Sequence, residues 1–209
     1  MAKIHPNYPA TSSSNISSSS SYCNSSEKET FTVWMKSLVF HGKGCTVFDS
    51  MGEVVFRVDN YQQRCSNQVF LMDSCGKVLF SINRKLWQKL WIWGCWEGFK
   101  CNDHNLRASK KRPWFQVTRN FSFWSKDISC RVSLKCNENT CYRIMGLEGK
   151  PGLKITDFSG QLLAEAVQKQ SSEGVPLGDD VLTLKVEAET DHSLIMALVT
   201  VYGLISNRV

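Results

Sequence analysis

The sequence predicts a mainly β protein, in which about twelve antiparallel strands form a closed barrel around one apolar C-terminal helix. Three observations support this prediction. Many short segments alternate between apolar and polar residues, an Asp-x-x-Gly motif recurs between such segments, and the C-terminal segment is apolar on nearly every side. A chain of 209 residues can bury a core of ordinary size in a single domain.

The strands are predicted from a period of two in the side chains. The pattern is clearest in residues 30–34, 54–58, 131–136 and 182–188. In the last of these, the apolar residues share one face and the polar residues share the other, so a shift of one residue would expose the whole apolar set. About twelve segments between Thr30 and Ala188 qualify as strands, against few helical stretches.

The turns are predicted from three copies of Asp-x-x-Gly, at 49–52, 73–76 and 157–160. The aspartate accepts hydrogen bonds from nearby backbone amides, and the glycine adopts the positive φ that leads into the next strand. We interpret these aspartates as turn formers rather than catalytic groups. Successive hairpins favour a sandwich or barrel over a parallel sheet.

The C-terminal helix is predicted to begin after Asp191 as its N-cap and to contain residues 194–205. Apolar side chains cover nearly its full circumference, so protein or lipid must enclose it. Twelve residues give about 18 Å of helix, whereas a membrane span needs about 20 residues. We therefore expect no transmembrane span and a helix enclosed by the barrel.

The N-terminal segment has a different composition. Ten of the sixteen residues at 11–26 are serine, a content too polar to form a core. We predict a disordered Ser-rich tail at 1–26 and a barrel domain at 27–209.

The nine cysteines and four histidines predict no metal or catalytic centre. The cysteine number is odd, no apolar leader follows Lys3, and no C-x-x-C pair occurs. We therefore expect reduced thiols that act mostly as small core residues. Because no hydrolase, phosphate-loop or metalloprotease motif occurs either, we predict no cofactor and no enzymatic activity.

The basic charge is concentrated in residues 81–126. This segment holds ten of the 25 Lys and Arg residues, only two acidic residues, and six of the seven tryptophans. Such a mixture suits an anionic membrane surface, and it also suits single-stranded nucleic acid. The structural alternative is that the tryptophans pack in the core and the cations point to water. The candidate lipid-binding cations are Arg84, Lys85, Lys89, Arg107, Lys110, Lys111 and Arg112, and the candidate interfacial aromatics are Trp91 and Trp93.

The sequence resembles the plant LURP-one-related family, whose domain is grouped with the tubby C-terminal and phospholipid scramblase domains. The resemblance covers about residues 27–207, and its motifs lie at 31–40, 46–58, 73–80 and from 178 into the C-terminal helix. It departs from the family at 188–191, where a Pro-Gly more often precedes the capping Asp. The resemblance implies a twelve-stranded barrel with the helix along its axis, and it carries over no catalytic residue.

These observations predict a non-enzymatic, monomeric module that binds anionic lipids such as phosphoinositides. The kinship with tubby and scramblase domains suggests a role in plant signalling or defence. The expected location is the cytoplasm, with peripheral membrane or nuclear localisation also considered. Two alternatives remain: a nuclear factor that contacts nucleic acid or a transcriptional partner, and a structural or interaction barrel without lipid binding. For the first, Lys110-Lys111-Arg112-Pro113 matches a short nuclear localisation signal.

Overall fold

The computed structural model describes residues 26–35, 44–59, 68–86, 94–101, 112–120, 128–135, 141–147 and 150–206. The strands are β1 (Glu29–Trp34), β2 (Gly44–Phe48), β3 (Val54–Asp59), β4 (Gln68–Asp73), β5 (Val78–Leu86), β6 (Gly94–Lys100), β7 (Phe115–Asn120), β8 (Ser129–Leu134), β9 (Cys141–Gly146), β10 (Gly152–Asp157), β11 (Leu162–Gln168) and β12 (Val181–Val186). One helix follows them, α1 (His192–Ile205).

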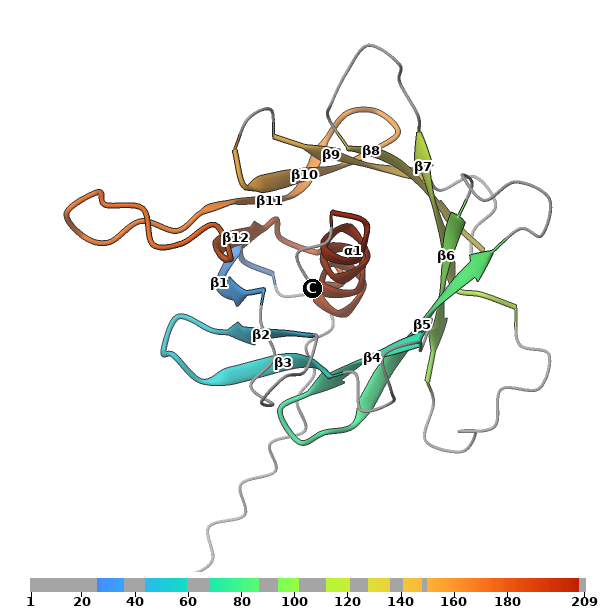
Figure 1. Cartoon of the computed structure of the whole chain (residues 1–209), viewed down its shortest axis with the longest axis horizontal. Helices are drawn as coiled ribbons and strands as arrows, with labels where there is room; N and C mark the ends of the chain where they lie inside the picture. The colour runs from blue at the N-terminus through green and yellow to red at the C-terminus, as the bar shows by residue number, and fades with distance from the viewer. Residues whose placement is uncertain are drawn as a thin grey trace, which may run out of the picture.

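The strands form a closed antiparallel barrel with the helix inside it (Figure 1). Each strand pairs with its neighbours in sequence, and β1 pairs with β12 to close the sheet, with Phe31 opposite Leu184. Closure removes the exposed sheet edges that would otherwise recruit other strands. The predicted fold class and the position of the helix are therefore confirmed.

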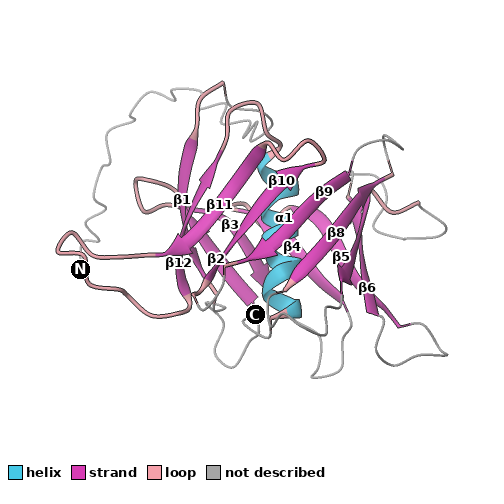
Figure 2. Cartoon of the chain, turned by 90° about the horizontal axis from the view of Figure 1, so that it is seen from above, coloured by secondary structure: helices cyan, strands magenta, loops and turns pink. Residues whose placement is uncertain are grey.

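The barrel interior is filled by apolar side chains from the strands and the helix. Figure 2 shows α1 running within the tilted strands, and every residue of α1 from His192 to Gly203 is buried. One close packing contact explains a glycine in β6, because a Cβ on Gly98 would lie only 2.1 Å from the ring of Phe115. Of the predicted core cysteines, Cys45 and Cys130 are buried, whereas four others that the structure describes are partly or fully exposed: Cys75, Cys95, Cys101 and Cys141.

The three Asp-x-x-Gly motifs form hairpin turns of the same geometry, as predicted. In the first, Asp49 Oδ1 accepts from the backbone amides of Met51 and Glu53, and Gly52 has a φ of 84°. Gly76 and Gly160 have φ values of 83° and 90°. The segment 171–174 repeats this turn with a serine in the first position, because Ser171 Oγ accepts from the amide of Val175 at 3.2 Å.

All three Asp-x-x-Gly turns lie at one end of the barrel, which we call the turn end. They follow β2, β4 and β10, and in an antiparallel barrel with sequential neighbours all even-numbered strands finish at the same end. The helix begins there too, because Asp191 caps it and lies 3.8 Å from Lys100 at the end of β6. The odd-numbered strands finish at the opposite end, so β11 and β12 are connected there.

Candidate functional site

The structure separates the predicted basic surface into two parts. Arg84 and Lys85 lie near the end of β5 and are exposed, whereas exposed Arg112 lies just before β7. The end of β5 and the start of β7 are at opposite ends of β6, which has seven residues and so spans roughly 20 Å. Lys89, Arg107, Lys110, Lys111, Trp91 and Trp93 lie outside the described residues, as does most of the predicted tail at 1–26.

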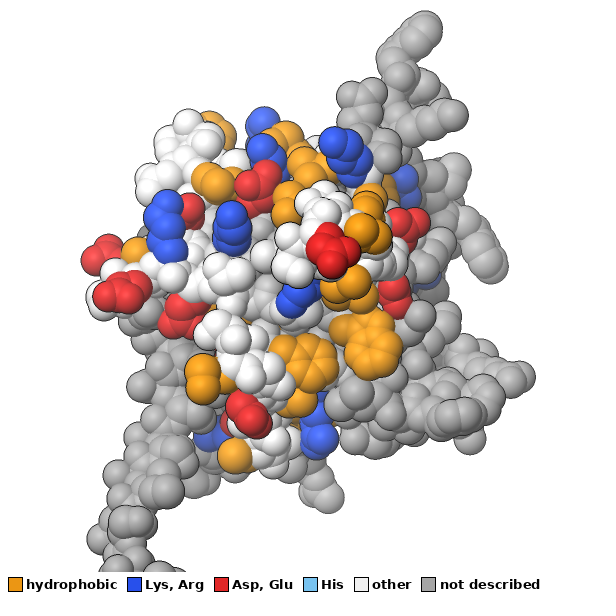
Figure 3. Space-filling view, turned by 90° about the vertical axis from the view of Figure 1, so that its left-hand side faces the viewer, with side chains coloured by type: hydrophobic (Ala, Val, Ile, Leu, Met, Phe, Trp, Pro, Cys, Tyr) orange, Lys and Arg blue, Asp and Glu red, His pale blue; other side chains and the backbone are white. Residues whose placement is uncertain are grey.

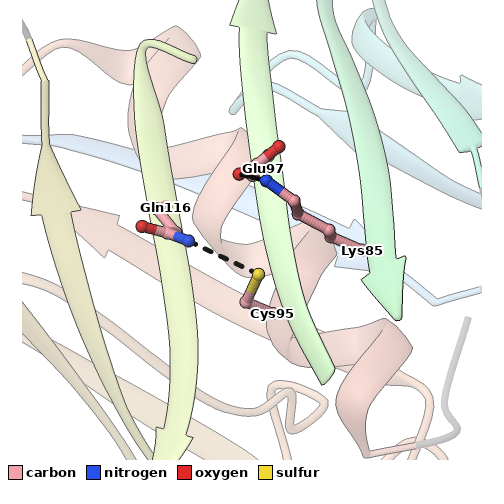
Figure 4. Close-up of polar contacts among 4 residues, drawn as sticks. All are labelled: Lys85, Cys95, Glu97 and Gln116. Atoms are coloured by element: carbon pink, nitrogen blue, oxygen red, sulfur yellow. Dashed lines mark hydrogen bonds and ion pairs between the residues drawn. The ribbon is translucent and has the colours of Figure 1, made fainter. Parts of the chain in front are cut away.

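Near the opposite end, Lys85 is already engaged with a carboxylate (Figure 4). Its Nζ lies 3.2 Å from Glu97 Oε1 on β6, and both side chains are on the outer face of the barrel. Beside this pair, Gln116 on the adjacent strand β7 donates a hydrogen bond from its Nε2 to Cys95 Sγ, at 3.4 Å. The Glu97 carboxylate offsets the charge of Lys85, whereas Arg84 makes no ion pair with a described residue.

Near the turn end, Lys100 and Trp114 pack against each other. Lys100 Nζ lies 5.0 Å from the centroid of the Trp114 ring and 3.8 Å from Asp191 Oδ2. Trp96 and Trp114 are partly buried against the core. For these two tryptophans, the structural interpretation is the one that the geometry supports.

Two pockets lie on the outer wall of the barrel. The first, of about 340 Å³, is lined by residues of β1, β2 and β12, and Lys169 Nζ donates to Thr32 Oγ1 there at 2.6 Å. It lies on the side of the barrel shown in Figure 3, where acidic, basic and apolar side chains are interspersed. The face shown therefore offers no surface of a single charge sign.

The second pocket, of about 250 Å³, contains two arginines. Arg131 of β8 and Arg143 of β9 are direct cross-strand partners, and both are exposed on the outer face. Asn120, Tyr142, Asp157 and the turn residue Phe158 complete the lining, together with Cys141. Sequence reasoning missed this pair, because only the register of β8 against β9 places residues twelve positions apart opposite each other.

Among the described residues, the titratable groups inside the barrel form no cluster of catalytic character. Burial raises the pKa of the Cys130 thiol to about 11, although the nearby Arg119 charge partly opposes this shift, and a protonated buried thiol is a poor nucleophile. His192 is 1% exposed and packs edge-on against Phe31, with ring centroids 5.5 Å apart. In the described part of the chain, no cluster of three or more potential metal-ligating side chains occurs.

The fold defines a barrel built around its own C-terminal helix, with the two pockets described above on its outer surface. The profile of the LURP-one-related family matches residues 29–203, so the chain belongs to this family. LURP-one-related 11 of Arabidopsis thaliana is 43% identical over 212 residues, which covers 99% of this chain and 89% of that protein. LURP-one-related 4 of the same plant is 42% identical and covers 87% of this chain and 80% of that protein.

A solved structure shows the same fold. A crystal structure of an Arabidopsis thaliana protein superposes with a TM-score of 0.61 at 14% identity, covering 88% of this chain and 94% of that one. Within the part of the chain that the structure describes, no helix has the length and apolar character needed to cross a membrane.

Proposed function

We propose that this protein is a non-enzymatic module that docks peripherally on anionic membrane surfaces through the turn end of the barrel. One observation carries the proposal. Met51 and Phe158, 84% and 83% exposed, are the most exposed large hydrophobic side chains among the described residues. Both project from Asp-x-x-Gly turns at this end. Bulky apolar groups at turn tips are suited to insertion among lipid headgroups.

Cations at the same end support the choice of an anionic surface. Arg112 and Lys135 are exposed there, at the start of β7 and the end of β8. The segment that contains Arg107, Lys110 and Lys111 joins Cys101 to Arg112, both of which lie at the turn end. Each Lys or Arg close to an anionic leaflet contributes about 1 kcal/mol to binding.

Vesicle sedimentation with a matched pair of variants tests the proposal. M51S/F158S removes the apolar tips at the turn end, and V175S/L177S removes two exposed apolar residues, 57% and 42% exposed, at the opposite end. We expect the first variant to bind phosphatidylserine- or phosphoinositide-containing vesicles about fivefold or more weakly, and the second to bind like the wild type. Equal loss in both variants would contradict docking through the turn end.

Charge reversal of Lys110, Lys111 and Arg112 tests the electrostatic part separately. We expect it to weaken binding at low ionic strength and to reduce the salt dependence of binding. If the wild-type protein does not sediment with any anionic vesicle at low salt, the proposed function is wrong.

A further inference from the structure

The outer wall of the barrel contains a pair of like charges. Arg131 and Arg143 are directly opposite each other on β8 and β9, and the alternation of these strands places both side chains outside, because their neighbours Val132 and Ile144 are buried. Like charges at directly opposed positions destabilise an antiparallel sheet. The fold alone therefore gives no reason for this pairing.

Two other outward-facing lysines on the described strands lie close to carboxylates. Lys85 lies 3.2 Å from Glu97, and Lys154 of β10 lies 3.1 Å from Glu165, its cross-strand partner on β11. By contrast, neither the Arg131 nor the Arg143 guanidinium makes an ion pair or hydrogen bond with any residue that the structure describes. Their donors are therefore available to a ligand.

The pocket around the pair is shaped for a small group. Its volume is about 250 Å³, and the exposed Phe158 provides aromatic surface beside the arginines, whereas the lining residue Tyr142 packs against the core. Asp157 also lines it, but its Oδ1 accepts from Ser159 Oγ at 2.7 Å and from the Gln161 amide at 2.8 Å. No ion pair joins this carboxylate to either arginine, so its hydrogen bonds are made within its own turn.

We infer that this pocket binds a phosphoryl group, held between the guanidinium groups of Arg131 and Arg143. A phosphate dianion offsets both positive charges, and the planar guanidinium donates two parallel hydrogen bonds to phosphate oxygens. Phe158 lines the same pocket and offers an apolar contact to the substituent that carries the phosphate. The phosphoryl group belongs either to a phosphoinositide headgroup, a source that rests on the proposed membrane docking, or to a soluble phosphomonoester.

Three variants of the full chain test the pocket. R131Q/R143Q removes both charges, whereas K154Q/K185Q removes two charges from the outer faces of β10 and β12 and serves as the charge-matched control. R131K/R143K keeps the charge and loses the paired donors, so it reports on guanidinium geometry. Circular dichroism and thermal unfolding establish that each variant is folded.

Binding is measured in two arms that distinguish the sources. The first compares vesicles that contain phosphatidylinositol 4,5-bisphosphate with phosphatidylserine vesicles of equal charge, and the second titrates soluble inositol 1,4,5-trisphosphate by calorimetry. We expect R131Q/R143Q to lose about tenfold or more of the affinity in at least one arm, R131K/R143K to lose part of it, and the control to retain it. Loss in the vesicle arm alone assigns the lipid source, and loss with the soluble probe assigns the phosphate site itself.

Two results would overturn the inference. One is wild-type binding that does not distinguish bisphosphate vesicles from phosphatidylserine vesicles, together with no binding of the soluble probe. The other is equal weakening by R131Q/R143Q and by the control. Since the soluble arm needs no membrane, the pocket is tested even if sedimentation shows that the protein does not dock on vesicles.

Discussion

Tyr202 of the central helix donates a hydrogen bond from its hydroxyl to the backbone carbonyl oxygen of Gly152 on β10, at 3.2 Å. The bond joins two buried groups 50 positions apart in the sequence and fixes the rotation of the helix within the barrel. Removal of the hydroxyl leaves the carbonyl with one partner fewer. We expect Y202F to lower the free energy of unfolding by about 1 kcal/mol, measured by denaturant titration. An unchanged denaturant concentration at the midpoint of unfolding would contradict this role.

The same hydroxyl explains Gly146 on β9. A Cβ at this position would lie 2.6 Å from Tyr202 Oη, so alanine must displace the tyrosine. We expect G146A to lower the free energy of unfolding in the wild type and to lower it less in the Y202F background. The double mutant is then less destabilised than the sum of the two single mutants. Additive effects would show that the two residues do not share this contact.

The central helix packs its side chains against the apolar interior of the barrel. Leu198 is fully buried, with 0% exposure. An aspartate there would bury an unpaired carboxylate, at a cost of several kcal/mol. We expect L198D to abolish cooperative unfolding and the dispersed NMR spectrum, whereas the volume-conserving L198M keeps both. A folded L198D with only a modest loss of stability would argue against enclosure of the helix by the barrel.

Local sequence signals predicted most of the fold, because each depends on residues close together in the chain. The alternation predicted for 182–188 is confirmed as far as Val186, where β12 ends, and Ala188 lies in the turn that follows. The three turn motifs and Asp191 as a cap are confirmed, and Asp191 Oδ1 accepts from the Leu194 amide at 3.1 Å. Closure of the barrel required long-range pairing of β1 with β12, which the family resemblance implied. The strand pattern alone was also compatible with a sandwich.

The candidate site was harder to predict, because it depends on register and strand direction. The segment 81–126 is one basic stretch in sequence, but β6 crosses it from one end of the barrel to the other and separates Lys85 from Arg112. No local pattern in the sequence marks Arg131 and Arg143, and only the register of β8 against β9 places them opposite each other. Phe158 appeared as an ordinary turn residue, and only its 83% exposure distinguishes it.

Asp157 makes stability depend on pH in the acid range. Hydrogen bonds from Ser159 Oγ and from backbone amides hold the pKa of this carboxyl below its ordinary value of 3.8. Because the folded-state pKa is the lower one, its contribution to stability is fully present above the unfolded-state pKa and is lost as the pH falls through the folded-state pKa. We expect the melting temperature of D157N to fall less than that of the wild type between about pH 5 and pH 2. Parallel curves for the two proteins would contradict the assignment.

Two cysteines are predicted to differ strongly in reactivity. Cys75 is exposed in a turn, whereas Cys130 is fully buried with a pKa raised to about 11 by burial. Since the thiolate is the reactive form, native protein at about pH 8 should be alkylated at Cys75 and not at Cys130. Peptide mass spectrometry with and without denaturant measures this, and C75S controls for the assignment of the rapid site. Rapid native labelling of Cys130 would show that the barrel opens locally at β8.

The link between β12 and the helix stores strain at Glu189, which has a φ of 59°. It is the only non-glycine residue of the described chain with a positive φ, and it lies in the 188–191 segment where the sequence departs from the Pro-Gly that the family more often has. A Cβ in this left-handed conformation costs roughly 1 kcal/mol, which glycine avoids. We therefore expect E189G to raise the free energy of unfolding by at most about 1 kcal/mol. The greater freedom of glycine in the unfolded chain offsets part of this gain. E189A keeps the Cβ and serves as the control, with no stabilisation expected. Equal stability of E189G and E189A in denaturant titrations would show that the left-handed turn carries no strain that glycine relieves.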